Sequence, residues 1–156
     1  MVEFALVSML MLVFVLGVMD FGFLFAGRVS AYEATRVAVR YAAVHPTNWS
    51  AAAAPGGNTI EGNLILTSVP AKVPNDDVHL IITYLVPGAG AAVLCGTWSA
   101  SAGAFQPQAG YTQATCVTSG RLVRIQAKYL YSFITPFLRT SFGSMTINTD
   151  ASALIE

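Results

Sequence analysis

The N-terminal part of the chain has the pattern of a single long helix. The run from Phe4 to Gly27 is apolar and carries one formal charge, at Asp20. A helix of this length spans about 36 Å, which is enough to cross a bilayer with tilt. Residues 28–44 contain neither Gly nor Pro. We therefore expect the helix to continue to the His45-Pro46 step, because the residue before a proline avoids the helical region.

The second half of this helix is amphipathic. Polar side chains recur every four residues on one side, at Arg28, Tyr32, Arg36 and Arg40. The opposite side is apolar with helical spacing, at Ala34, Val37, Ala38 and Tyr41. This pattern predicts that the second half packs on the rest of the chain, whereas the first half is apolar all round.

The remainder of the chain has the pattern of a β-rich head. A linker rich in Pro, Ala and Gly covers 46–59. Strand signals follow at Ile60–Ser68, Val78–Val86, Leu122–Tyr131 and Met145–Ile155. In the last two, apolar and polar residues alternate, which is typical of antiparallel strands with one buried face. The predicted fold class is α+β, with a long N-terminal α-helix (1–45) packed on a small antiparallel β-sheet head (46–156).

Charge is scarce and balanced along the chain. Charged residues make up 10% of the sequence, and eight Lys and Arg balance eight Asp and Glu. A nucleic-acid partner is not expected, because such a partner requires a basic face. No charged residue occurs from Val86 to Gly120. An uncharged region of this kind fits either a surface outside the cell or a surface buried between subunits, and the sequence leaves both open.

The two cysteines predict a disulfide rather than a metal site. Cys95 and Cys116 form no C-x-x-C motif, and only His45 and His79 could join them at a metal. We predict no metal and no cofactor. If the head faces an oxidising compartment, a Cys95–Cys116 bond is expected, with a stabilisation of about 3 kcal/mol from loop closure.

No catalytic constellation is present in the sequence. The segment Asn75–His79 combines two carboxylates with an imidazole, but Pro74-Asn75-Asp76 also has the composition of a turn that leads into a strand. The turn is the favoured interpretation. The glycines at Gly88, Gly90 and Gly96 do not follow a strand-to-helix phosphate pattern. The chain is therefore not expected to be an enzyme.

Three explanations of the apolar N-terminus compete. A secretory signal peptide needs a cationic start and a shorter apolar run, although Val29-Ser30-Ala31 resembles a cleavage site. An ordinary membrane anchor conflicts with the charges, because Arg28, Arg36 and Arg40 all follow the apolar run. The positive-inside rule would then place the head in the cytoplasm, where a disulfide does not persist. A processed prepilin, whose basic leader preceded Met1 and was removed, avoids this conflict.

The two acidic residues of the apolar half are candidate assembly residues. An ionisable group at membrane depth is costly and indicates function by default. Glu3 could instead lie at the interface or favour the positive helix N-terminus, and Asp20 could mark the end of the span. In the alternative, each carboxylate meets a cation of a neighbouring subunit. Gly17 and Gly22 are small residues that would allow close approach of helices.

Both ends of the chain resemble one family. The segment Val2–Val7 and the later Leu16–Gly22 resemble the N-terminus of TadE-like pilins and pseudopilins of tight-adherence (Flp-type) type IV pili. The segments 123–129 and 134–138, with a Ser/Thr/Ala-rich strand that ends at Glu156, resemble the C-terminal pattern of that family.

The resemblance implies a prepilin that starts in the inner membrane. A prepilin peptidase would cleave it, and the pilus assembly machinery would extract it into an extracellular, cell-surface filament. The resemblance also carries the acidic residue of pilin N-termini onto Glu3, which would pair with the α-amino group of an adjacent subunit.

The leading hypothesis is a structural subunit of a helical homopolymer. Its Phe4–Gly27 helices would bundle, with Phe4 at the start of the contact and Gly17 and Gly22 near close approaches. The alternatives are a membrane-anchored minor pilin or assembly factor that primes or caps another filament, and an anchored adhesin that uses the uncharged 86–120 region.

Overall fold

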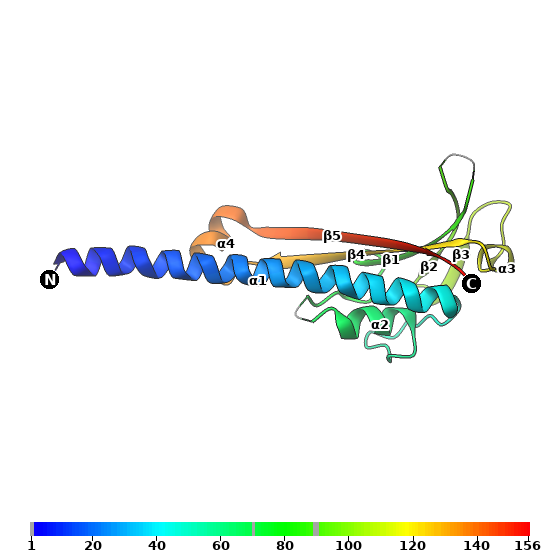
Figure 1. The fold of residues 1–156 in the computed structure, drawn as a ribbon, viewed down its shortest axis with the longest axis horizontal. Helices are drawn as coiled ribbons and strands as arrows, with labels where there is room; N and C mark the ends of the chain where they lie inside the picture. Colours follow the sequence, from blue (N-terminus) through cyan, green and yellow to red (C-terminus); the bar gives the residue numbers. More distant parts are fainter. Residues whose placement is uncertain (1, 70, 89–90) are drawn as a thin grey trace.

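The computed structural model describes residues 2–69, 71–88 and 91–156. In chain order its elements are α1 (Val2–Val44), α2 (Ile60–Thr67), β1 (Leu80–Val86), β2 (Val93–Ser99), β3 (Ala104–Pro107), α3 (Gln113–Cys116), β4 (Leu122–Ser132), α4 (Pro136–Phe142) and β5 (Ser144–Leu154). The predicted α+β class is confirmed, because one long N-terminal helix packs on an antiparallel sheet (Figure 1).

The sheet has five strands in the order β3-β2-β1-β4-β5, and every neighbouring pair is antiparallel. The alternation predicted for β4 is present, since Val123, Ile125 and Ala127 are buried and the residues between them are half-buried. Together with Ile82 and Tyr84 of β1, these side chains form the centre of the core. The helices α1 and α2 contribute to the same core, so they cover the same face of the sheet (Figure 1).

The prediction of a strand at Ile60–Ser68 is wrong, because this segment forms α2. The Thr59 side chain accepts a hydrogen bond from the Gly62 N–H and caps the helix. Ile60 and Leu64 lie four residues apart and are both buried, as the helical period requires. A short apolar run does not distinguish a strand from a helix by periodicity alone. Gly62 is also required sterically, since a Cβ there would lie 1.8 Å from the Gly56 carbonyl oxygen.

The second half of α1 packs on the sheet through small side chains. The buried positions on this side are Ala31, Ala34, Thr35, Ala38, Val39 and Ala42. Short side chains let the helix axis approach the sheet closely. The predicted polar stripe is exposed, as expected. Val37 was predicted on the packed side and is 39% exposed, because the packed stripe is centred on the alanines.

The predicted disulfide is present. Cys95 of β2 is bonded to Cys116 of α3, with a Cα–Cα distance of 5.6 Å. The uncharged stretch between the two cysteines contains β3 and α3 as well as the end of β2. Phe105 of β3 and Trp98 of β2 both pack against Trp49 of the linker. Part of the uncharged region is thus the core of the head.

The Asn75–His79 segment forms the predicted turn. One Asp76 oxygen, Oδ1, accepts hydrogen bonds from the N–H groups of Val78 and His79, at 2.9 and 2.7 Å. Asp77 has a different partner and accepts from the Ala100 N–H at 2.7 Å. Each carboxylate therefore stabilises a different piece of backbone.

One carboxyl group lies in the core of the head. Glu61 of α2 is fully buried, and its Oε2 accepts a hydrogen bond from the Ser50 N–H at 2.9 Å. Its other oxygen, Oε1, has no hydrogen-bond partner among the described residues. Burial raises the pKa of Glu61 to about 7, although the hydrogen bond from Ser50 acts in the opposite direction.

Candidate functional site

The N-terminal end of α1 projects beyond the rest of the molecule (Figure 1). Every described side chain from Glu3 to Met19 is exposed except Gly17, which is half-exposed. Phe4 is 78% exposed, and many other large apolar side chains in this segment are exposed as well. A surface of this size and composition requires a cover of lipid or of other apolar helices. In the described part of the chain, α1 is the one helix long and apolar enough to cross a membrane.

Glu3 and Gly17 lie on this projecting segment, whereas Gly22 lies beyond Asp20 at an exposed position of the helix. Glu3 lies in the first turn of α1, exposed, and forms no ion pair within the described ranges. A Cβ added at Gly17 or at Gly22 would meet nothing within 4 Å. Neither glycine is therefore needed for packing inside the subunit, so both stay available for contacts outside it.

Asp20 is different from these residues, because it is only 1% exposed. The segment that follows β4 returns to α1 at this point. The N–H of Ile134 donates to Asp20 Oδ1 at 2.9 Å, and the N–H of Thr135 donates to Asp20 Oδ2 at 2.8 Å. The Tyr131 hydroxyl donates to the Asp20 carbonyl oxygen at 2.9 Å. One carboxylate in the helix thus holds two backbone donors of the β4–α4 connection.

This arrangement explains why the apolar helix contains an aspartate. Thr135 precedes α4 but makes no side-chain capping bond, and Pro136 brings no N–H group. The donors at Ile134 and Thr135 would lack acceptors if Asp20 were absent. The sequence left open whether Asp20 marks the end of the span or meets a neighbouring subunit. In the structure its carboxylate is bound by its own head.

Beyond Asp20, α1 is joined to the head by close packing and hydrogen bonds. A Cβ at Gly27 would lie 2.9 Å from the Tyr129 ring, so Gly27 is the glycine at which the helix approaches β4. Thr35 and Thr149 are buried and hydrogen-bonded to each other through their Oγ1 atoms at 2.8 Å. Sequence reasoning missed these contacts, because Gly27 and Thr35 have no local pattern that sets them apart.

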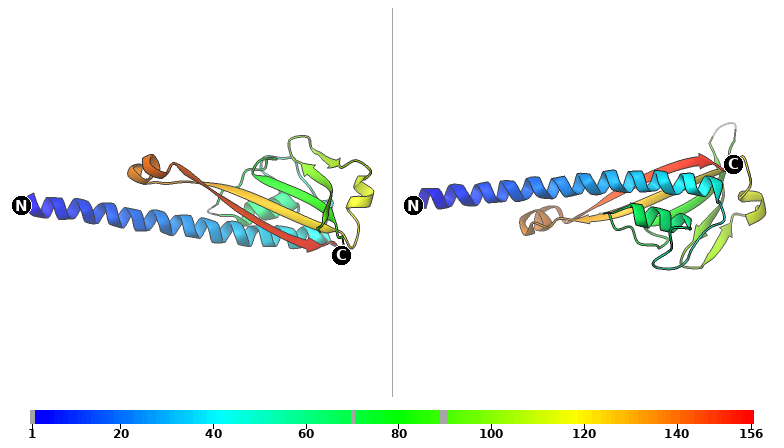
Figure 2. Two further views of the ribbon diagram at one scale, coloured as in Figure 1. Left: turned by 90° about the horizontal axis from the view of Figure 1, so that it is seen from above. Right: turned by 60° about the horizontal axis from the view of Figure 1, so that its bottom comes forward.

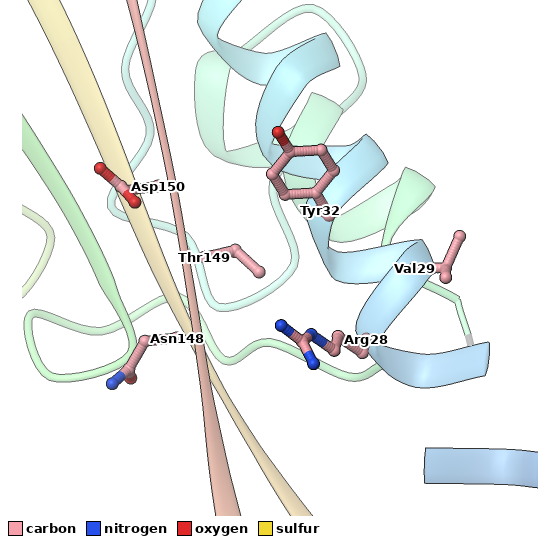
Figure 3. Close-up of a pocket in the computed structure, with 6 residues that line it drawn as sticks. All are labelled: Arg28, Val29, Tyr32, Asn148, Thr149 and Asp150. Carbon is pink, nitrogen blue, oxygen red and sulfur yellow. The ribbon is translucent and has the colours of Figure 1, made fainter. Parts of the chain in front are cut away.

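A groove runs between α1 and the edge strand β5, where the hairpin diverges from the helix (Figure 2). One cavity of about 370 Å³ is lined by Arg28, Val29, Tyr32, Asn148, Thr149 and Asp150. Figure 3 shows the Arg28 side chain reaching from α1 toward Asn148 and Thr149 of β5. A second cavity of about 280 Å³ continues from Arg28 to Leu24 and Met145. The groove is open, and the described residues contain no cluster of three or more His, Cys, Asp or Glu that could hold a metal.

Comparison with known families recognises most of α1, including its projecting part and most of its packed part. Residues 1–40 match the family of TadE-like proteins. No curated protein matches the chain, and no solved structure does. The TadE-like match includes Glu3, Asp20 and Gly27, and it stops before the end of α1.

Proposed function

We propose that the chain is a structural subunit of a Tad-like type IV surface filament and polymerises through the first half of α1. The observation that carries this proposal is the division of one continuous helix. Its second half is fixed to the head, whereas the described side chains from residue 3 to residue 15 are all exposed. The hairpin meets the helix only from about Leu16 and Met19 onward. A rigid apolar projection of this kind fits lipid before assembly and copies of itself afterwards.

Glu3 is proposed to set the step between subunits. A carboxylate inside a bundle of apolar helices must be neutralised by a partner or a proton. The α-amino group of an adjacent subunit is the proposed partner. Docking would then be favourable only at the axial position where the two groups meet, so that the pair acts as a register device.

The location and the partners follow from the same proposal. The precursor would reside in the inner membrane, where a prepilin peptidase and the pilus assembly machinery would act on it. The mature subunit would then be part of an extracellular filament. The TadE-like match over residues 1–40 supports the association with a Tad pilus system, and the proposed role is structural rather than enzymatic.

Shearing of cell-surface material tests the proposal. The sheared fraction should contain filaments in micrographs, and this chain should be their most abundant subunit by quantitative mass spectrometry. Gly22→Leu adds bulk at an exposed position of the apolar half of α1 and should reduce the filament yield without loss of membrane insertion. A chain that is present at a few copies per filament of another pilin would contradict the homopolymer and support the priming or capping role.

A further inference from the structure

The β4–β5 hairpin ends in a tip, residues 133–143, which reaches farther toward the N-terminus of α1 than the rest of the head (Figure 1). Its position along the helix is given by Asp20, whose carboxylate is bound to Ile134 and Thr135. Ile134 also lines a small apolar cavity with Leu16 and Phe23 of α1. The tip thus lies beside the apolar half of the helix rather than beside its amphipathic half.

The depth of the tip can be estimated from the helix rise. The distance from Phe4 to Asp20 along a helix is about 24 Å. The hydrocarbon core of a bilayer is about 30 Å thick. If Phe4 lies at one boundary of this core, Asp20 lies about 6 Å short of the other boundary. The head cannot avoid the membrane surface in this position, because its tip is at the level of Asp20.

The outer surface of the tip has the composition of a membrane-interface element. Ile134 is 70% exposed and Phe142 is 64% exposed. Met145, just beyond the tip, is also an exposed apolar side chain. Arg139 lies among them, exposed, and it forms no ion pair within the described ranges. Apolar side chains beside a cation are the combination that binds at the boundary between acyl chains and anionic headgroups.

Backbone N–H groups of the tip have acceptors within the protein, as an environment without water requires. Unpaired N–H groups are costly in a membrane. The two donors that precede α4 are held by Asp20, and the Gly143 N–H donates to the Arg139 carbonyl at 3.0 Å. Buried Phe133 fills the space under the tip and packs against Phe21 of α1, with ring centroids 6.3 Å apart.

From these observations we propose that the hairpin tip is a second membrane contact, which binds the lipid surface on the head side of the bilayer. Ile134 and Phe142 enter the interface, and Arg139 meets lipid phosphate. Asp20 joins this contact to the spanning helix, so the head has one fixed height and one fixed orientation on the membrane. The inference requires that α1 crosses the membrane, and it does not require that the subunits polymerise.

The test compares the two ends of the same hairpin in the full chain. Phe142→Cys places a label at the tip, and Leu154→Cys places one at the far end of β5, where the native side chain is 58% exposed. Each variant is labelled with a polarity-sensitive fluorophore without reductant, so that the native disulfide is kept. The labelled proteins are reconstituted into vesicles of phosphatidylcholine and phosphatidylglycerol that contain lipids spin-labelled near the headgroup.

We expect severalfold stronger quenching by the spin-labelled lipids at position 142 than at position 154, with the reverse order for aqueous iodide. Ile134→Cys provides a second tip position if the variant at 142 does not fold, and it should behave in the same way. Equal iodide quenching at the tip and at position 154, with no quenching by lipid at either, would overturn the proposal. Filament formation has no influence on this result, because the measurement is made in the membrane.

Discussion

The two halves of α1 belong to one unbroken helix, yet they meet different surroundings. From Phe4 to Val15 the described side chains are exposed on all sides of the helix. From Asp20 onward a buried stripe runs along the helix, and most of its members are alanines. Apolar side chains occur in both halves, but the second half also carries an exposed polar stripe. The two halves further differ in the size of their apolar side chains, because only the alanine stripe lets a sheet approach.

The difference shows which part of α1 packs on its own head and which part is left for lipid or for other helices. A helix with large apolar residues all round has no preferred face toward its own head, and it is covered by lipid or by other helices. A helix with a narrow stripe of small residues selects one partner, which here is the sheet. Asp20 lies at the division between the two. Its bonds to Ile134 and Thr135 fix the lowest point at which the head is attached.

The largest effect should come from Glu3→Ala. This change removes the proposed charge pair between subunits, and breaking a buried pair costs about 4 kcal/mol at each interface. The yield of sheared filaments should fall sharply, whereas the melting temperature of the head in detergent should stay the same. The control is Glu33→Ala, because Glu33 is an exposed acidic residue on the same helix with only a 3.8 Å contact to Arg36. Normal filament yield from Glu3→Ala would remove Glu3 from the assembly account.

Asp20→Ala should give the opposite result and lower the stability of the head. The buried N–H of Thr135 and the partly buried N–H of Ile134 lose a charged acceptor, for which about 3 kcal/mol is expected. Chemical unfolding in detergent, followed by tyrosine and tryptophan fluorescence, measures this loss. In the same assay Glu33→Ala should change the free energy of unfolding by less than about 0.5 kcal/mol. If Asp20→Ala left head stability unchanged and affected only assembly, the division of α1 at Asp20 would be wrong.

The pH dependence of the head sharpens the comparison, since it depends on Glu61 and not on α1. Burial raises the pKa of Glu61 from 4.5 to about 7 in the folded state. The folded protein therefore holds a proton that the unfolded chain releases between these values. The contribution of Glu61 to the free energy of unfolding is fully present below pH 4.5. It decreases by about 3 kcal/mol as the pH rises to 7.

Melting curves at pH 5 and pH 8 measure this decrease. The variant Glu61→Gln, which is neutral at both values, should show a smaller difference between them. An identical difference in the variant and the native protein would assign the pH dependence to other groups. The carboxyl groups of Asp76 and Asp77 have pKa values lowered by their hydrogen bonds, net of desolvation, so their contribution is lost only at more acidic pH.

The smallest effect on stability is expected from a leucine placed on the packed side of α1, at Ala38, or at an exposed position of α1, at Gly22. Ala38→Leu overpacks the contact between α1 and the sheet and should destabilise the head by about 2 kcal/mol. Gly22→Leu should leave the head unchanged, because a Cβ at Gly22 has no neighbour within 4 Å. Unfolding of both variants in detergent provides the comparison. Equal destabilisation by both would mean that the surface of α1 around Gly22 also packs on the head.

The elements with a long, regular pattern could be predicted from the sequence. The helix α1 and the strands β4 and β5 are of this kind, because their periods persist over many residues. The helix α2 could not be predicted, since Leu64-Ile65-Leu66 is too short a run to show a period. The partners of Asp20 were also out of reach. Ile134 lies 114 residues away in sequence, and nothing near either residue indicates that the two meet.

The candidate assembly residues illustrate the same limit. Glu3, Gly17 and Gly22 were selected because polar and small residues are rare in apolar helices. In the structure Glu3 is exposed, and a Cβ at either glycine would meet nothing within 4 Å. Asp20 was selected on the same grounds, but its carboxylate accepts hydrogen bonds from the head of its own chain. The local pattern shows that an acidic residue in such a helix needs a partner. Only the fold decides whether that partner is inside the subunit or outside it.

The most direct test of the division of α1 is a helical reconstruction of the sheared filaments. The account predicts a central bundle in which residues 4–19 of neighbouring copies pack together. In each copy, the Asp20 carboxylate should still accept the N–H groups of Ile134 and Thr135 from its own chain. Filaments in which residues 4–19 lie outside the central bundle, or in which Asp20 is bound to a cation of another subunit, would contradict the account.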